Sequence, residues 1–160
     1  MTALLSFSHI FLKRISQVEV LFFSYNSHKG RERMYIFVNP NPKGALIGDC
    51  SVRALSIALD LPWDDTYLIM ADYGFRLKNL PNADSVWGEV LKDNGFTRKA
   101  IPDTCPACYT VRAFCQDHPK GTYVLGTGSH VVAVIDGDYY DTWDSGDEVP
   151  IMYWREYGVL

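Results

Sequence analysis

The sequence predicts an α+β protein in which N-terminal helices pack on a C-terminal antiparallel sheet. Apolar residues recur at helical spacing over the first part of the chain, and after Gly121 the apolar period changes to two. The chain has 160 residues, of which 48% are hydrophobic and 14% aromatic, so it can bury the core of one globular domain. This composition excludes a disordered chain, and no internal repeat or linker divides it.

Four helices are expected before Gly121. The first begins at Cys50, carries an apolar stripe and ends before Pro62, which cannot continue a helix. The second opens with two aspartates at its positive end, and the third and fourth each follow a residue whose side chain can cap a helix. The expected helical spans are 50–60, 63–73, from Asn82 or Asp84 to 93, and from Thr110 to His118.

One short strand precedes these helices and the other strands follow them. The first strand ends where two prolines remove backbone donors and hold the chain extended. Asp136 and Gly137 are a strong two-residue hairpin signal between two β-rich runs, so they also predict how the flanking strands pair. The expected strands are 35–38, 122–125, 130–135, 139–143 and 149–154.

Residues 1–33 contain apolar stretches that superficially resemble a targeting segment. Charged residues interrupt these stretches, no small-residue cleavage site follows, and none reaches the ~18 apolar residues of a membrane span. The residues from Lys29 to Met34 are ones that purine-rich codons encode, as in a ribosome-binding site before a start codon. We therefore expect residues 1–33 to be a leader outside the core and residues 34–160 to be the domain, with a genuine N-terminal helix as the alternative.

Charge and cysteine usage narrow the class of protein. The formal net charge is −4, and no run of Lys and Arg is interleaved with aromatic residues, so nucleic acid is not an expected partner. The four cysteines lack the regular spacing of a disulfide framework, and no secretory signal precedes them. We expect a cytoplasmic protein that binds neither nucleic acid nor membrane.

Cys50 is the candidate nucleophile because it stands in the first turn of an expected helix. Unpaired N–H groups and the helix dipole stabilise a thiolate at that position. Gly48, two residues earlier, lets the backbone turn sharply and leaves room for a substrate. A buried packing cysteine is the alternative, since free cysteines are among the most buried residues.

His130 and Asp141 are the expected partners of this thiol. His130 opens a strand behind a run of small residues, which leaves its imidazole accessible. A general base is itself oriented by a third group. The two-residue hairpin places Asp141 opposite Val132 and on the face that carries His130, whereas Asp138 and Asp144 point to the other face.

The order of a helix-starting cysteine, a strand-starting histidine and an acidic residue on the next strand resembles the papain-like cysteine peptidase superfamily. GSHVVAVIDGDYYDTWDS, at 128–145, is similar to the His–Asp hairpin of its compact bacterial and phage members, and the likeness covers about residues 35–157. GDCSVRAL, at 48–55, also resembles the nucleophile motif of ovarian-tumour-type deubiquitinases, although the hairpin favours the broader group. The resemblance implies a papain-like fold and a cysteine peptidase activity.

One departure from the papain pattern concerns the oxyanion hole. The family commonly supplies a glutamine a few residues before the cysteine, and this chain has none there. The expected donors are the backbone N–H of Cys50 and the side chain of Asn41 or Asn39, with a structural turn as the alternative role of the asparagines. Asp49 is expected to be either a solvated turn residue or an anchor behind the site. The candidate oxyanion and substrate-binding residues are Asn41, Asp49, Ser129 and Trp143, of which Trp143 has burial as its alternative.

A rival pattern lies at residues 105–118. Cys105, Cys108, Cys115 and His118 follow each other with spacing that could hold zinc. A helix is expected to begin inside the six-residue spacer, which would place Cys115 on its apolar side. We therefore expect packing and loop cysteines here, and no metal.

The sequence as a whole predicts a cysteine peptidase or amidase that acts on a peptide, protein or other amide substrate without a cofactor. In this interpretation Cys50 attacks a carbonyl as a thiolate, His130 takes and returns the proton, and Asp141 orients the imidazole. The alternatives are a non-catalytic binding or regulatory module on the same fold and an acyltransferase that uses the same triad.

Overall fold

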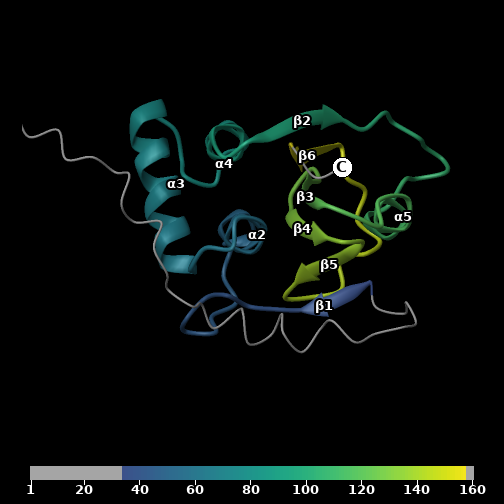
Figure 1. Ribbon diagram of the computed structural model, residues 1–160, viewed down its shortest axis with the longest axis horizontal. Helices are drawn as coiled ribbons and strands as arrows, with labels where there is room; N and C mark the ends of the chain where they lie inside the picture. The colour runs from purple at the N-terminus through teal and green to yellow at the C-terminus, as the bar shows by residue number, and fades with distance from the viewer. Residues whose placement is uncertain (1–33, 158–160) are drawn as a thin grey trace, which may run out of the picture. The chain divides into compact units, whose positions relative to one another are not determined.

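Six strands form one sheet in the computed structural model, which describes residues 34–157 (Figure 1). Their order is β1-β5-β4-β3-β6-β2, so the two strands that come first in the chain form the two edges. The expectations for residues 1–33 lie outside the described residues. The strands are β1 (Tyr35–Phe37), β2 (Phe96–Ala100), β3 (Thr122–Gly126), β4 (Val131–Ile135), β5 (Asp138–Asp141) and β6 (Met152–Glu156).

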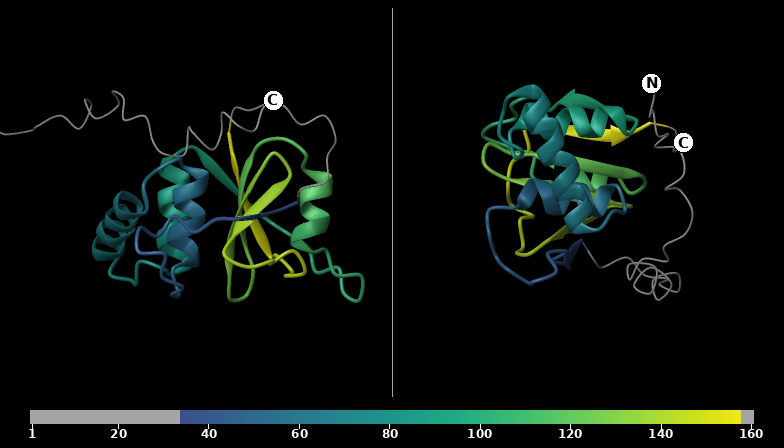
Figure 2. Two further views of the ribbon diagram at one scale, coloured as in Figure 1. Left: turned by 90° about the horizontal axis from the view of Figure 1, so that it is seen from below. Right: turned by 90° about the vertical axis from the view of Figure 1, so that its left-hand side faces the viewer.

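Four helices cover the two faces of this sheet. Figure 2 shows three of them, α2, α3 and α4, on one face and the fourth, α5, on the opposite face. Because α2 packs directly against β4, the start of α2 can approach the start of that strand. The helices are α2 (Cys50–Ala58), α3 (Trp63–Leu77), α4 (Asp84–Asp93) and α5 (Val111–Asp117).

The α+β class is confirmed, but the sheet is mixed rather than wholly antiparallel. β1 pairs in parallel with β5, with Tyr35 opposite Tyr139, and the other pairings are antiparallel. β2 was not predicted: four of its five residues are exposed, so its side chains lack the apolar alternation of a half-buried strand. Several bounds also differ: α3 continues past residue 73, β5 ends at Asp141 rather than residue 143, and β6 begins at Met152 rather than Val149.

One of the predicted helix caps is correct and another is wrong. Thr110 caps α5 as predicted, because its hydroxyl accepts the Ala113 N–H at 3.2 Å. The predicted cap of α4 by Asn82 or Asp84 is wrong, since Ala83 is the N-cap residue and no side chain caps the helix. Asp84 instead accepts a hydrogen bond from the indole of Trp87 at 3.1 Å.

The hairpin between β4 and β5 has the predicted turn and register. Asp136 and Gly137 both have positive φ, 51° and 79°, which is the backbone of a two-residue turn that matches the strand twist. Ile135 pairs with Asp138, and the ladder continues in that register toward the other end of β5. Continuing it one pair beyond Ala133 brings Asp141 opposite Val132.

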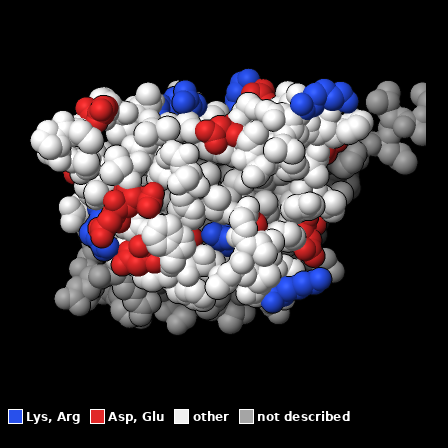
Figure 3. All heavy atoms as spheres, turned by 180° about the vertical axis from the view of Figure 1, so that it is seen from behind, with Lys and Arg blue, Asp and Glu red and all other residues white. Residues whose placement is uncertain are grey.

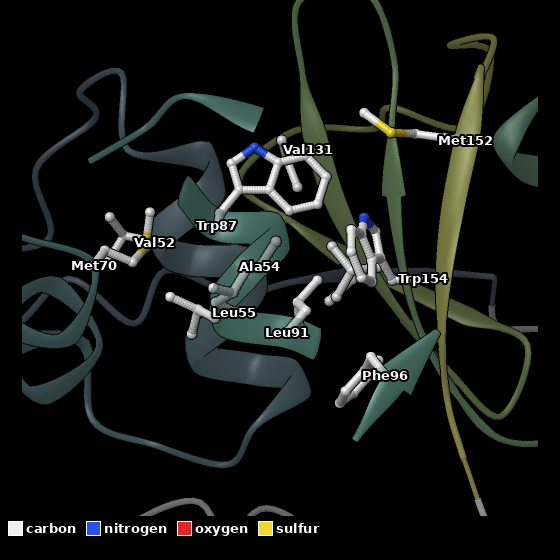
Figure 4. Close-up of a cluster of buried hydrophobic side chains, with 13 residues drawn as sticks. Val52, Ala54, Leu55, Met70, Trp87, Leu91, Phe96, Val131, Met152 and Trp154 are labelled. Carbon is white, nitrogen blue, oxygen red and sulfur yellow. The ribbon is translucent and has the colours of Figure 1, made fainter. Parts of the chain in front are cut away.

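The main core lies between the sheet and the helices α2 and α4 (Figure 4). Trp87 and Trp154 meet edge to face there, with ring centroids 6.2 Å apart. Gly88 permits this approach, because a Cβ atom at that position would lie 2.8 Å from the Trp154 ring. A second cluster, which includes Phe114 and Cys115, fills the space beneath α5. Burial of each large apolar side chain stabilises the fold by about 1.5–3 kcal/mol.

The distribution of surface charge and the length and polarity of the helices bear on the expected partners. Among the described residues on the face seen in Figure 3, acidic and basic side chains are interspersed and form no continuous basic surface. Within residues 34–157, each helix is too short or too polar to span a bilayer.

Candidate active site

Cys50 is the first residue of α2. Asp49 occupies the N-cap position, but its carboxylate makes no capping hydrogen bond. The carboxylate binds the guanidinium of Arg53 and the indole N–H of Trp63, the latter at 2.9 Å. The N–H groups of the first turn of α2 are therefore not capped by a side chain, and they favour negative charge beside Cys50.

A hydrogen-bonded turn fixes the position of His130 at the start of β4. The Thr127 hydroxyl accepts the N–H groups of Ser129 at 3.3 Å and His130 at 3.0 Å, and the Thr127 N–H donates to the His130 carbonyl at 2.8 Å. Thr127 itself is buried, so its hydroxyl is held in place within the turn. Sequence analysis did not single out Thr127, although a threonine before a turn of small residues is a recognisable turn signal.

The side chains of His130 and Asp141 meet at the end of the hairpin. Nε2 of His130 lies 2.5 Å from Oδ2 of Asp141, and the Ser145 hydroxyl donates to the same oxygen at 2.7 Å. The other carboxylate oxygen accepts the Thr142 N–H at 2.7 Å. Burial raises the pKa of Asp141, but the hydrogen bonds from His130 and Ser145 outweigh it, so the pKa lies below its ordinary value.

The His130 side chain is the neighbour that lowers the pKa of the Cys50 thiol most strongly. Because Asp141 engages Nε2, Nδ1 is the ring nitrogen that remains for the sulfur. Burial raises the pKa of Cys50, but the hydrogen bond and charge of His130, the N–H of Val131 and the charge of Arg53 together lower it below its ordinary value. These contacts favour a thiolate.

The same contacts act on the imidazole in the opposite sense. Burial lowers the pKa of His130, but its hydrogen bonds to Asp141 and Cys50 and their charges raise it to about 9. A lowered thiol pKa beside a raised imidazole pKa favours the thiolate–imidazolium pair over the neutral pair.

Arg53 connects the helix of the nucleophile to the carboxylate at the other end of the site. It is 6% exposed and lies between two carboxylates, paired with Asp49 and, from Nη2 to Oδ1 at 3.4 Å, with Asp141. Sequence analysis did not identify this residue as part of the site. The spacing of Asp49 and Arg53, four residues apart on a helix, is the signal that could have indicated the first of these ion pairs.

Asp49 and Asn41 lie together behind the nucleophile. Asp49 is 5% exposed, which fits the anchor role and not the solvated turn that was its alternative. The Asn41 amide donates to Asp49 at 3.3 Å, while its oxygen accepts the Lys43 N–H at 3.0 Å. The Asn39 amide donates to the Ala45 carbonyl at 3.2 Å. Both asparagine side chains thus shape the loop before α2.

Trp143 and Ser129 are both neighbours of His130, the first through its ring and the second through its backbone. The Trp143 ring is tilted against the imidazole, with centroids 5.2 Å apart, and the residue is 46% exposed. Burial, the alternative role of Trp143, is therefore incomplete, and one part of the indole faces solvent beside the base. Ser129 is exposed and contacts the site through its backbone, in the turn that Thr127 closes.

The possible zinc ligands at residues 105–118 are placed apart. Cys105 and Cys108 are exposed on the loop before α5, whereas Cys115 lies on the buried side of that helix. The His118 ring stacks on Phe114, and its Nδ1 lies 3.0 Å from the Phe114 carbonyl. No group of three or more His, Cys, Asp or Glu side chains among residues 34–157 is arranged to bind a metal ion.

The described residues thus define an α+β protein in which a histidine hydrogen-bonded to an aspartate acts on the pKa of a helix-starting cysteine. A scan against protein-family models finds no match to the chain, and searches of curated proteins and of solved structures find none either.

Proposed function

We propose that this protein is a thiol hydrolase that cleaves amide bonds in peptides, proteins or other amide substrates, with Cys50, His130 and Asp141 as its catalytic triad. The observation that carries the proposal is the hydrogen bond between the His130 imidazole and the Asp141 carboxylate, on an imidazole that also lowers the pKa of the Cys50 thiol at the start of α2. A cysteine that only packs in a core needs neither a buried base nor a carboxylate behind that base.

In the proposed reaction the Cys50 thiolate attacks the carbonyl carbon of the amide and forms a C–S bond. The His130 imidazolium gives its proton to the leaving nitrogen as the C–N bond breaks, which leaves an acyl group on the sulfur. The neutral imidazole then takes a proton from water, the hydroxide oxygen attacks the acyl carbon, and the acid leaves with the thiolate restored. Asp141 keeps the ring oriented and stabilises its charged form throughout.

The negative charge that develops on the carbonyl oxygen needs donors near Cys50. The uncapped N–H groups at the start of α2 support a role for the Cys50 backbone N–H. Asn41 was the expected side-chain donor, but its amide already serves Asp49. We therefore assign Asn41 to the loop that shapes the start of the helix, and Trp143, half-exposed beside His130, to substrate contact.

The papain-like architecture is part of the same proposal. Support comes from the order of the elements, with the nucleophile at the start of α2 and the base and the carboxylate on the hairpin of β4 and β5. The strand at β1 was expected, but its parallel pairing with β5 and the edge strand β2 were not.

The proposal is tested with an activated ester and with a peptide library. p-Nitrophenyl acetate should acetylate Cys50, seen as an adduct on the peptide that carries it, and then release acetate in repeated turnovers. Members of a mixed peptide-amide library should be cleaved by the wild-type protein and not by Cys50→Ala. Cys108→Ser, which removes an exposed thiol from a distant loop, should leave both activities unchanged.

Each alternative function gives a different result in these assays. A stable acetyl adduct on Cys50 without turnover would identify a module that keeps the site without hydrolysis, and it would contradict the proposal. Transfer of the acetyl group to an added amine in preference to water would identify an acyltransferase. Equal labelling of Cys50, Cys105 and Cys108 by iodoacetamide would show that the triad does not activate the thiol.

A further inference from the structure

Two cysteines outside the candidate active site lie in contact with each other. Cys105 and Cys108 are both exposed, on the loop between β2 and α5, and their sulfur atoms are 3.4 Å apart. Cys50 belongs to the active site, and Cys115 is fully buried on the inner side of α5. Neither is placed to form a disulfide with Cys105 or Cys108. The thiol hydrolase reaction does not use the pair.

The loop holds the two sulfurs on the same side of a short turn. The Cys105 N–H donates to the Asp103 carboxylate at 3.0 Å, and the Tyr109 N–H donates to the Thr104 hydroxyl at 2.8 Å. These two hydrogen bonds hold the backbone at Cys105 and just after Cys108. A disulfide requires an S–S distance of about 2.05 Å, which is shorter than the observed contact, so side-chain rotation within an exposed loop has to supply the rest.

We propose that Cys105 and Cys108 form a redox-active dithiol that closes to a disulfide on reaction with a low-molecular-weight disulfide. The sulfur–sulfur contact and the exposure of both residues carry this inference, which is independent of the hydrolase reaction. An exposed dithiol is open to exchange with solutes, whereas a buried thiol such as Cys115 is shielded from them.

The electrostatics of the pair assign the two sulfurs different roles. The hydrogen bond to Cys108, followed by the hydrogen bond and charge of Asp103, raises the pKa of Cys105 to about 11. Asp103, which accepts the Cys105 N–H, places its negative charge beside Cys105 and disfavours a thiolate there, so we assign the first attack to Cys108. Its thiolate attacks one sulfur of the disulfide and expels one thiolate, which forms a mixed disulfide. Cys105 then loses its proton to solvent, attacks the Cys108 sulfur and expels the second thiolate.

In this exchange two protein thiols are oxidised and one small disulfide is reduced to two thiols. The test incubates the full chain with oxidised glutathione, quenches with acid and maps the peptides. The wild-type protein should lose the mass of two hydrogen atoms in a peptide that joins Cys105 to Cys108, with no glutathione left on either residue. In Cys50→Ser, which lacks the reactive thiol of the active site, iodoacetamide applied after denaturation should label two thiols fewer than in the untreated variant.

Matched serine variants separate this pair from the other cysteines. Cys105→Ser should keep glutathione on Cys108, because the sulfur that resolves the mixed disulfide is missing, and Cys108→Ser should likewise fail to lose two hydrogen atoms. Cys50→Ser should form the internal disulfide as the wild-type protein does. The proposal is overturned if wild-type protein retains glutathione on Cys105 or Cys108, or if the new disulfide contains Cys50.

Discussion

Burial and hydrogen bonding act in opposite directions on the Cys50 thiol, and hydrogen bonding prevails. Burial alone would raise the pKa of Cys50, yet His130, the Val131 N–H and Arg53 lower it. The thiolate is therefore stabilised by identifiable neighbours. Substitution of His130 or of Arg53 removes one of them at a time. The predictions at the scale of residues follow from these neighbours.

The pH dependence of Cys50 alkylation reports the first of these effects. Because the pKa of Cys50 is lowered, the rate of iodoacetamide labelling should reach half its maximum at a lower pH than for an ordinary thiol. His130→Ala should move that midpoint upward, since burial would then act unopposed by the imidazolium. Hydrolysis should decline as the pH rises through about 9, where His130 loses the proton that the leaving group needs. Identical midpoints in the two proteins would contradict the pairing.

Asp141→Asn should slow the labelling of Cys50 at neutral pH and raise its midpoint while the protein stays folded. The change removes the charge that keeps the pKa of His130 high, so the imidazolium is less stable beside the thiolate. Asp138→Asn is the matched control, because Asp138 lies on the same strand and is also buried. If Asp138→Asn slows labelling more than Asp141→Asn does, then Asp138 and not Asp141 orients the histidine.

Arg53→Met should destabilise the protein by about 3–5 kcal/mol, because it removes the guanidinium that pairs with two buried carboxylates and leaves Asp49 without a cation. The free energy of unfolding in urea at pH 7 measures this loss. In an Asp49→Asn background one of the two carboxylates is already neutral, so the same substitution should cost less, by about 0.5–3 kcal/mol. An equal cost in both backgrounds would mean that the ion pair with Asp49 contributes nothing.

Two turns determine where His130 and Asp141 lie on the strands that carry them. The turn before β4 depends on the Thr127 hydroxyl, which accepts two backbone N–H groups, one of them from His130. The hairpin after β4 depends on Asp136 and Gly137, whose positive φ angles set the register that delivers Asp141. A base and its orienting carboxylate are thus positioned by two turns at opposite ends of one strand.

Thr127→Val keeps the shape of the side chain and removes the acceptor. The substitution should cost about 1 kcal/mol, because the N–H groups of Ser129 and His130 lose the hydroxyl that accepts them. It should also slow iodoacetamide labelling of Cys50, since His130 is held less firmly. Thr97→Val in the exposed strand β2 is the control and should change neither quantity. Labelling at the wild-type rate in Thr127→Val would show that this turn does not position the base.

The same elements show why some of the fold was predictable and some was not. The hairpin followed from Asp136 and Gly137 because two-residue turns are local, and the helix at Cys50 followed from apolar periodicity. β2 was missed because its exposed side chains carry no pattern, and the parallel pairing of β1 with β5 joins segments about a hundred residues apart. The role of Arg53 was missed because its contact with Asp141 exists only in the folded chain.

Across the whole molecule, stability should be highest where the sheet is paired on both sides. β3 and β4 each have two neighbours, whereas β1 and β2 form the edges with one neighbour each. β3 and β4 also contribute fully buried residues to the two core clusters on opposite faces of the sheet. The hairpin end that carries His130 therefore rests on the most protected strands.

Hydrogen exchange measures this gradient directly. Amides of β3 and β4 should exchange only through global unfolding, with the same free energy that urea unfolding gives. Amides of β2, an edge strand with mostly exposed side chains, should exchange through smaller openings and hence faster. Exchange from β2 as slow as from β4, followed by mass spectrometry of peptides, would contradict this view of the sheet.

Cys50 comes before His130 and Val131 in the chain, so the thiol is synthesised before the groups that lower its pKa. Cys50 is made early, whereas His130 and Val131, which lower its pKa, belong to the last third of the chain. β1 likewise cannot pair with β5 until residues 139–141 exist. Because the ribosome makes the N-terminal part first, a nascent chain carries Cys50 without the groups that stabilise its thiolate. The cell is therefore exposed to the reactive form only after most of the protein has been translated.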